Sequence, residues 1–90
     1  MTGQLKQLRD RIDAIDSELL KLLSARADLA REIGQVKNGI AYRPEREAQV
    51  LARLCKLNLG PLANEHVVRL FTEVMSLCRS LEEREQEHSE

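Results

Sequence analysis

Two basic side chains stand on one side of a long amphipathic segment, at a spacing that could bind an anion. Arg26 occupies a place where a stripe of leucine, isoleucine and valine would otherwise carry an apolar residue. A guanidinium in an apolar seam is costly unless it meets an anion, so Arg26 either pairs with a carboxylate at a helix interface or binds an acidic ligand. Lys37 follows eleven residues later, about three helical turns, and points the same way. Ala30 and Gly34 lie between them, and these small residues are either merely tolerated there or make room for a ligand in a shallow positive recess.

The segment that carries these cations is expected to form one long helix at about 4–38. At 1.5 Å per residue it would be roughly 50 Å long, more than a compact domain of this size spans. Two shorter helices cannot cover its whole apolar stripe, which predicts a homodimer. The stripe alternates spacings of three and four, as a helical seam does, through Leu5, Leu8, Ile12, Ile15, Leu19, Leu22, Leu29, Ile33 and Val36.

Arg9 lies on the flank of the same stripe, seventeen residues before Arg26. The two are roughly 25 Å apart along the axis, so one helix cannot bring both to one recess. If two copies of this helix pack antiparallel, Arg9 of one copy approaches Arg26 and Lys37 of the other, and the two-fold axis creates two equal shared sites. From its position alone, Arg9 is more often a surface arginine.

A second helix is expected at about 44–58, because Pro44 suits a first helical turn and an Asn-Leu-Gly-Pro run begins at Asn58. Arg46 and Glu47 stand at the N-terminal edge of its apolar face. They are either ordinary solvated charges at a helix start or further members of the recess, with Arg46 adding a cation and Glu47 accepting a hydrogen bond.

A third helix is expected at about 64–84, with Cys78 on its apolar stripe and Glu82 one turn later. Glu82 is either part of the recess or the start of a frayed end. The charged run at 83–87 is expected to be solvated and partly disordered. The fold class predicted is therefore all-α, with three helices per chain and a long first helix.

Composition narrows the function classes. Ninety residues suit a single domain, and a net charge of −1 carries no general basic field for nucleic acid. No apolar run approaches the length of a membrane span. Cys55 and Cys78 lack metal-ligand or redox spacing, so both are expected to be reduced in a cytoplasmic protein. No motif indicates a metal or another cofactor.

The ordered set of motifs resembles the all-helical chorismate mutases, specifically the N-terminal mutase domain of bifunctional chorismate mutase–prephenate dehydratases. The resemblance covers roughly residues 5–82 and leaves open whether the chain is free-standing or part of a larger enzyme. It rests on Leu8-Arg9, the stretch SARADLA at 24–30, GQVK at 34–37, PEREAQVL at 44–51, GPL at 60–62 and RLF at 69–71.

The resemblance implies an intertwined homodimer that converts chorismate to prephenate in phenylalanine and tyrosine biosynthesis, without a cofactor. It implies two shared sites, each with Arg9 from one chain and, from the other, Arg26, Lys37, Arg46, Glu47, Cys78 and Glu82. Arg43 stands where many relatives carry an aspartate that contacts the substrate hydroxyl, so that contact is not carried over.

These residue types suit a unimolecular rearrangement of a dicarboxylate. Arg26 and the partner's Arg9 would bind the carboxylates, because a guanidinium fork binds them bidentately. Lys37 and a protonated Glu82 would donate to the ether oxygen as negative charge develops there. Glu47 would accept from the substrate hydroxyl. The alternatives are an isochorismate pyruvate lyase, a mutase of the amino analogue of chorismate, or a non-catalytic helical dimerisation module.

Overall fold

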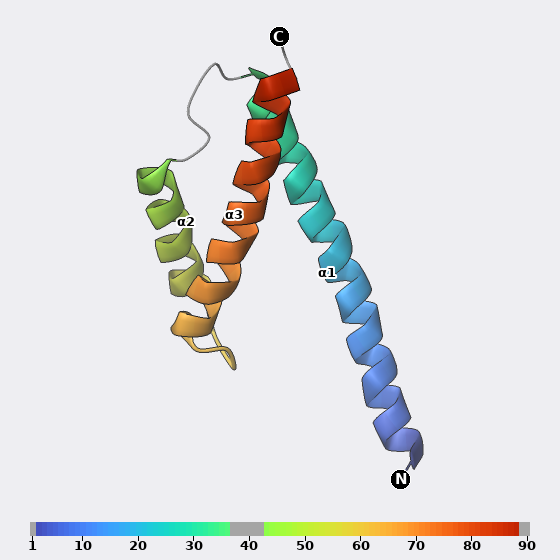
Figure 1. Ribbon diagram of the computed structural model, residues 1–90. Helices are drawn as coiled ribbons and strands as arrows, with labels where there is room; N and C mark the ends of the chain where they lie inside the picture. The colour runs from blue at the N-terminus through green and yellow to red at the C-terminus, as the bar shows by residue number, and fades with distance from the viewer. Residues whose placement is uncertain (1, 37–42, 89–90) are drawn as a thin grey trace.

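The structure is a computed structural model that describes residues 2–36 and 43–88, with side chains for 3–36 and 43–85. These residues contain no strand and three helices. They are α1 (Thr2–Val36), α2 (Pro44–Leu57) and α3 (Asn64–His88) (Figure 1). The predicted all-helical class, with three helices and a long first one, is confirmed. The end expected for the first helix, near residue 38, lies outside the described residues.

Helices α1 and α3 run in the same direction, close together at their C-terminal ends and apart at their N-terminal ends (Figure 1). Small side chains let the two helices approach. Ala30 of α1 is buried with Val74 and Cys78 of α3, and Ala27 and Phe71 pack against this cluster. With few large side chains between the helices, the backbones come close and the core is correspondingly thin.

Gly34 is neither merely tolerated in the helix nor a residue that makes room for a ligand, the two interpretations that the sequence allowed. A Cβ atom built on Gly34 would lie 2.6 Å from the carbonyl oxygen of Glu82 and 2.9 Å from its Cα. The missing side chain therefore makes room for the backbone of α3 and not for a ligand. The cost of glycine inside a helix, about 1 kcal/mol relative to alanine, is accepted here for a close helix crossing.

Helix α3 continues beyond the expected end near residue 84, so the expectation of a partly disordered run at 83–87 is wrong. The reason is a contact that local sequence does not reveal. Glu85 accepts hydrogen bonds from Nε of Arg31 at 2.9 Å and from Nε2 of Gln35 at 3.1 Å. The hydrogen bond and the charge of Glu85 raise the pKa of Arg31 above its ordinary value. These contacts tie the last turns of α3 to α1.

Helix α2 packs antiparallel on α3 and begins at Pro44, with Glu45 and Glu47 in its first turn. The connection to α3 is organised by Asn58, whose Nδ2 donates to the carbonyl oxygen of Leu62 at 2.7 Å. Its Oδ1 accepts from the backbone N–H of Gly60 at 3.0 Å. Gly60 has φ +83°, which favours glycine, and its peptide bond to Pro61 is cis.

The N-terminal part of α1 projects away from the other two helices, and the chain measures 59 × 27 × 15 Å (Figure 1). Every residue from 3 to 25 is exposed. Among the described helices, none contains an apolar stretch of the length that a membrane span needs. Within one chain, the apolar stripe of α1, which was expected to pack against a second copy, is exposed to solvent over most of the helix. Its exposed residues include Leu5, Leu8, Ile12, Ile15, Leu19 and Leu22.

Candidate active site

A cavity of about 490 Å³ lies between α1 and α2, with α3 as its base. No Cα atom of α1 lies within 8 Å of one in α2, so side chains alone span the space between these helices. The cavity thus draws its wall from three segments that are far apart in the sequence. Its lining residues are Arg26, Leu29, Ala30, Ile33, Arg43, Arg46, Glu47, Val50, Met75, Cys78, Arg79 and Glu82.

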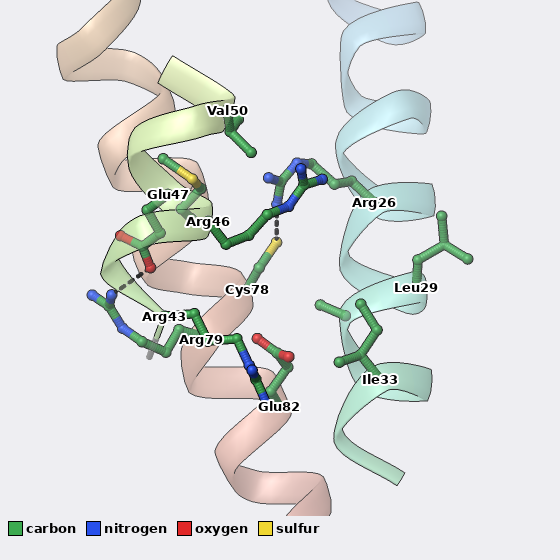
Figure 2. Close-up of a pocket in the computed structure, with 12 residues that line it drawn as sticks. Arg26, Leu29, Ile33, Arg43, Arg46, Glu47, Val50, Cys78, Arg79 and Glu82 are labelled. Carbon is green, nitrogen blue, oxygen red and sulfur yellow. Dashed lines mark hydrogen bonds and ion pairs between the residues drawn. The ribbon is translucent and has the colours of Figure 1, made fainter. Parts of the chain in front are cut away.

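Arg26 and Arg46 extend toward one another from opposite walls, above the thiol of Cys78 (Figure 2). Nη1 of Arg26 donates a hydrogen bond to Sγ of Cys78 at 3.1 Å, and Cys78 is buried. Neither guanidinium forms an ion pair within the described part of the chain. Two facing cations beside a weak acceptor repel each other, so the arrangement favours an anion between them.

Glu47 and Arg79 form an ion pair across α2 and α3, with Nη1 of Arg79 donating to Oε2 of Glu47 at 2.7 Å (Figure 2). Both side chains are about three-quarters buried. Sequence reasoning missed Arg79 altogether. The available signal was its spacing, because Met75, Arg79 and Glu82 follow one another at four and three residues and so share one face of α3.

Glu82 and Arg43 complete the described wall. Glu82 is half-buried and lines the cavity, with its backbone against Gly34. It is therefore not part of a frayed end. Arg43, the residue before α2, is extended at φ −129° and also lines the cavity. The predicted set of Arg26, Arg46, Glu47, Cys78 and Glu82 thus meets at one place, with Arg43 and Arg79 added.

One predicted site residue does not reach this cavity within the described chain, and another is not described. Arg9 is exposed on the projecting part of α1 and does not line it. Lys37 lies outside the described residues. The described part of the chain therefore supplies five of the seven predicted site residues, and the antiparallel pairing invoked for Arg9 involves a second copy.

The cavity carries more positive than negative charge. Four guanidinium groups and two carboxylates line it. This excess of positive charge suits a small ligand with more than one carboxylate, because each guanidinium can bind a carboxylate through two parallel N–H donors. Among the described residues, no group of three or more His, Cys, Asp or Glu side chains could hold a metal ion.

Comparisons with known proteins agree with the motifs. The family model for chorismate mutase type II matches residues 8–83. A bifunctional chorismate mutase/prephenate dehydratase of Pseudomonas aeruginosa is 50% identical over an alignment of 88 residues that covers 89% of this chain and 24% of that protein. The chain thus spans about a quarter of the length of that bifunctional relative. A chorismate mutase of Methanocaldococcus jannaschii is 31% identical over 93% of this chain and 89% of its own length.

Solved structures show the same fold. The chorismate mutase of Helicobacter pylori in complex with prephenate has a TM-score of 0.88 and 34% identity, covering 94% of this chain and 96% of that one. The chorismate mutase of Thermus thermophilus has a TM-score of 0.85 and 37% identity, covering 90% of this chain and 96% of that one. Motifs, family model, relatives and fold agree: the chain belongs to the chorismate mutase type II family.

Proposed function

We propose that the protein rearranges chorismate to prephenate, an intramolecular reaction that requires no cofactor. The observation that carries the proposal is the pair of guanidinium groups, Arg26 and Arg46, that face each other with no carboxylate partner in the described chain. Chorismate is a dicarboxylate of a size that a cavity of about 490 Å³ accommodates. The family membership and the prephenate bound to the Helicobacter pylori relative support the same substrate.

The residues act by selecting a compact conformer and by stabilising charge that develops in the transition state. Arg26 and the partner's Arg9 hold the substrate through its carboxylates, with Arg46 adding positive charge, so that the carbon atoms to be joined are already close. As the carbon–oxygen bond breaks, Lys37 and a protonated Glu82 donate to the ether oxygen, where negative charge increases. Glu47 accepts a hydrogen bond from the substrate hydroxyl. No nucleophile takes part, because the bond made and the bond broken belong to one molecule.

The proposal includes a homodimer in which α1 of each chain covers the other. The large apolar residues along the projecting part of α1 are exposed within one chain, for example Ile12 by 56% and Ile15 by 59%. An exposed apolar stripe of this length indicates an interface. An antiparallel pairing of the two α1 helices brings Arg9 of one copy to the cavity of the other and completes two shared sites.

Two further parts of the proposal concern the chain as a whole. Residues 1–90 form one mutase domain, which the packing of α3 against both α1 and α2 supports. The protein works in the cytoplasm, which is supported by the two cysteines, since Cys55 and Cys78 are both free thiols.

The activity is tested by following the loss of chorismate absorbance with purified protein and identifying the product by chromatography. Prephenate as the product supports the proposal. Salicylate and pyruvate from isochorismate, without prephenate from chorismate, indicate a lyase instead. If only the amino analogue of chorismate reacts, the enzyme is a mutase of that compound. A dimer without turnover at any point from about pH 4 to 8 indicates a dimerisation module.

The dimer is tested by light scattering at micromolar concentration, where we expect twice the chain mass of 10.3 kDa. Ile15→Asp places a charge in the exposed apolar stripe and should give monomers with lower activity. The matched control is Ser17→Asp, on an exposed part of the same helix outside the stripe. The dimer is contradicted if the unaltered protein scatters as a monomer while its helical circular dichroism is retained.

A further inference from the structure

We infer that the Glu47–Arg79 pair makes the site selective for a substrate that presents a hydroxyl group over one that presents an amino group at the same carbon. The inference rests on the proposed function, since it concerns the substrate of the same cavity. Arg79 is assigned as a positioning residue, because it acts through Glu47. The observation that carries the inference is the 2.7 Å contact between Nη1 of Arg79 and Oε2 of Glu47. Both side chains are about three-quarters buried.

The pair leaves Glu47 with one oxygen for the substrate. Its Oε2 is occupied by Arg79, and no donor from the described residues reaches Oε1. The backbone of Glu47 is also anchored, because its N–H donates to the carbonyl oxygen of Arg43 at 3.0 Å. Glu47 is therefore held by its backbone N–H and by Oε2, while Oε1 is left to accept a hydrogen bond from a ligand in the cavity. A hydroxyl group can donate one hydrogen bond to such an atom.

The charge around Glu47 discriminates between a hydroxyl and an ammonium group. Arg79 neutralises Glu47, while Arg43 and Arg46 line the same cavity and add positive charge without an acidic partner in the described chain. A neutral hydroxyl donates to Oε1 without any change of charge. An ammonium group at the same place is attracted only weakly to Glu47, because Arg79 already neutralises this carboxylate. The ammonium group is also repelled by the guanidinium groups. The site is thereby built to accept the alcohol and reject the amine.

Selectivity is measured as the ratio of kcat/KM for chorismate to kcat/KM for 4-amino-4-deoxychorismate, at about pH 6, where an aliphatic amine is protonated. Both compounds carry the same two carboxylates, so general effects of a substitution on folding or on dianion binding cancel in the ratio. Arg79→Gln removes the positive charge beside Glu47 and shortens the side chain that holds it. We expect the ratio to fall by roughly tenfold in this variant, because one repulsive unit charge near the amine is lost.

Three further variants test whether the selectivity ratio changes in the direction that the charges predict. Arg79→Lys retains the charge and should keep the ratio within about threefold of the unaltered enzyme. Glu47→Gln keeps an acceptor oxygen but removes the negative charge, and should raise the ratio. This variant also keeps the inference testable if Arg79→Gln does not fold. Arg53→Gln, an exposed arginine of α2 outside the cavity, should change neither the ratio nor the activity.

The outcomes separate this inference from the proposed function. If the unaltered protein prefers chorismate and Arg79→Gln and Glu47→Gln move the ratio in opposite directions as stated, the pair determines selectivity. If the unaltered protein rearranges chorismate but both variants keep its ratio, the inference is wrong and the proposed function stands. If the unaltered protein rearranges chorismate but prefers the amino compound, only the inference is overturned. If it does not rearrange chorismate at all, both are overturned.

Discussion

The backbone of α1 at Gly34 lies directly against the backbone of α3 at Glu82, so close that a Cβ atom on Gly34 would be 2.6 Å from the carbonyl oxygen of Glu82. Glu82, which lines the cavity, is thus positioned by Gly34, a residue that has no side chain. Because the neighbour is backbone, it cannot rotate away as a flexible side chain would. The position of Glu82 in the cavity is therefore linked to the crossing of α1 and α3.

Gly34→Ala should destabilise the protein and lower its activity together. The added methyl group collides with the α3 backbone, which costs about 1–3 kcal/mol, while the better helix propensity of alanine returns about 1 kcal/mol, so the net loss is up to about 2 kcal/mol. Glu82 should shift away from the ether oxygen, so kcat should fall more than KM rises. Urea unfolding measures the first effect and steady-state kinetics the second.

Gly3→Ala is the matched control for that substitution, because Gly3 lies on the same helix with open space around it. It should leave activity unchanged and stability equal or slightly increased. If Gly34→Ala behaves in the same way as Gly3→Ala, the close approach of α1 and α3 at Gly34 does not contribute to stability, and Gly34 does not position Glu82.

Arg26→Ala should reduce turnover by at least about a hundredfold, the usual cost of losing one fixed donor in a site of this kind. The fold should remain, because the only hydrogen bond that the side chain of Arg26 makes in the described chain is to the weak acceptor Sγ of Cys78. Circular dichroism and light scattering check the fold. Arg11→Ala, an exposed arginine of α1, is the control and should remain fully active. Unfolding or dissociation of Arg26→Ala would instead identify Arg26 as a structural pairing residue.

Arg9 should act on the cavity of the partner chain. When an Arg9→Ala chain and an Arg26→Ala chain exchange subunits, one site of the heterodimer receives both substitutions and the other receives neither. Two nearly inactive parents should therefore recover up to about half of the activity per heterodimer. Exchange is verified with chains of different mass. A verified heterodimer that remains inactive would contradict a site shared between chains.

The turnover number should decrease as pH rises through the titration of Glu82. Only the protonated carboxyl can donate to the ether oxygen, and the protonated fraction falls with increasing pH. Glu82→Gln supplies an amide donor at every pH, so it should flatten this dependence while retaining much of the rate at low pH. The pH profile of kcat measures both. Identical profiles for the two proteins would show that Glu82 is not the donor.

Much of the fold follows from local patterns. The apolar stripe from Leu5 to Val36 has the period of one long helix, and Pro44 marks the start of the next helix, because both signals depend on neighbours along the chain. Arg26 was recognisable for a similar reason, since a cation in an apolar stripe calls for an anion wherever the helix lies. The family resemblance followed from short ordered motifs.

What the sequence by itself determined is therefore the three helices, their apolar faces and two of the four described cations of the cavity, Arg26 and Arg46. The tertiary structure decided how α1 and α3 cross, and with it the purpose of Gly34, the extension of α3 through the contact of Glu85 with Arg31, and the place of Arg79 beside Glu47. The physical reason is that these contacts join residues 32 to 54 positions apart, and helical periodicity carries no information about which faces of separate helices meet.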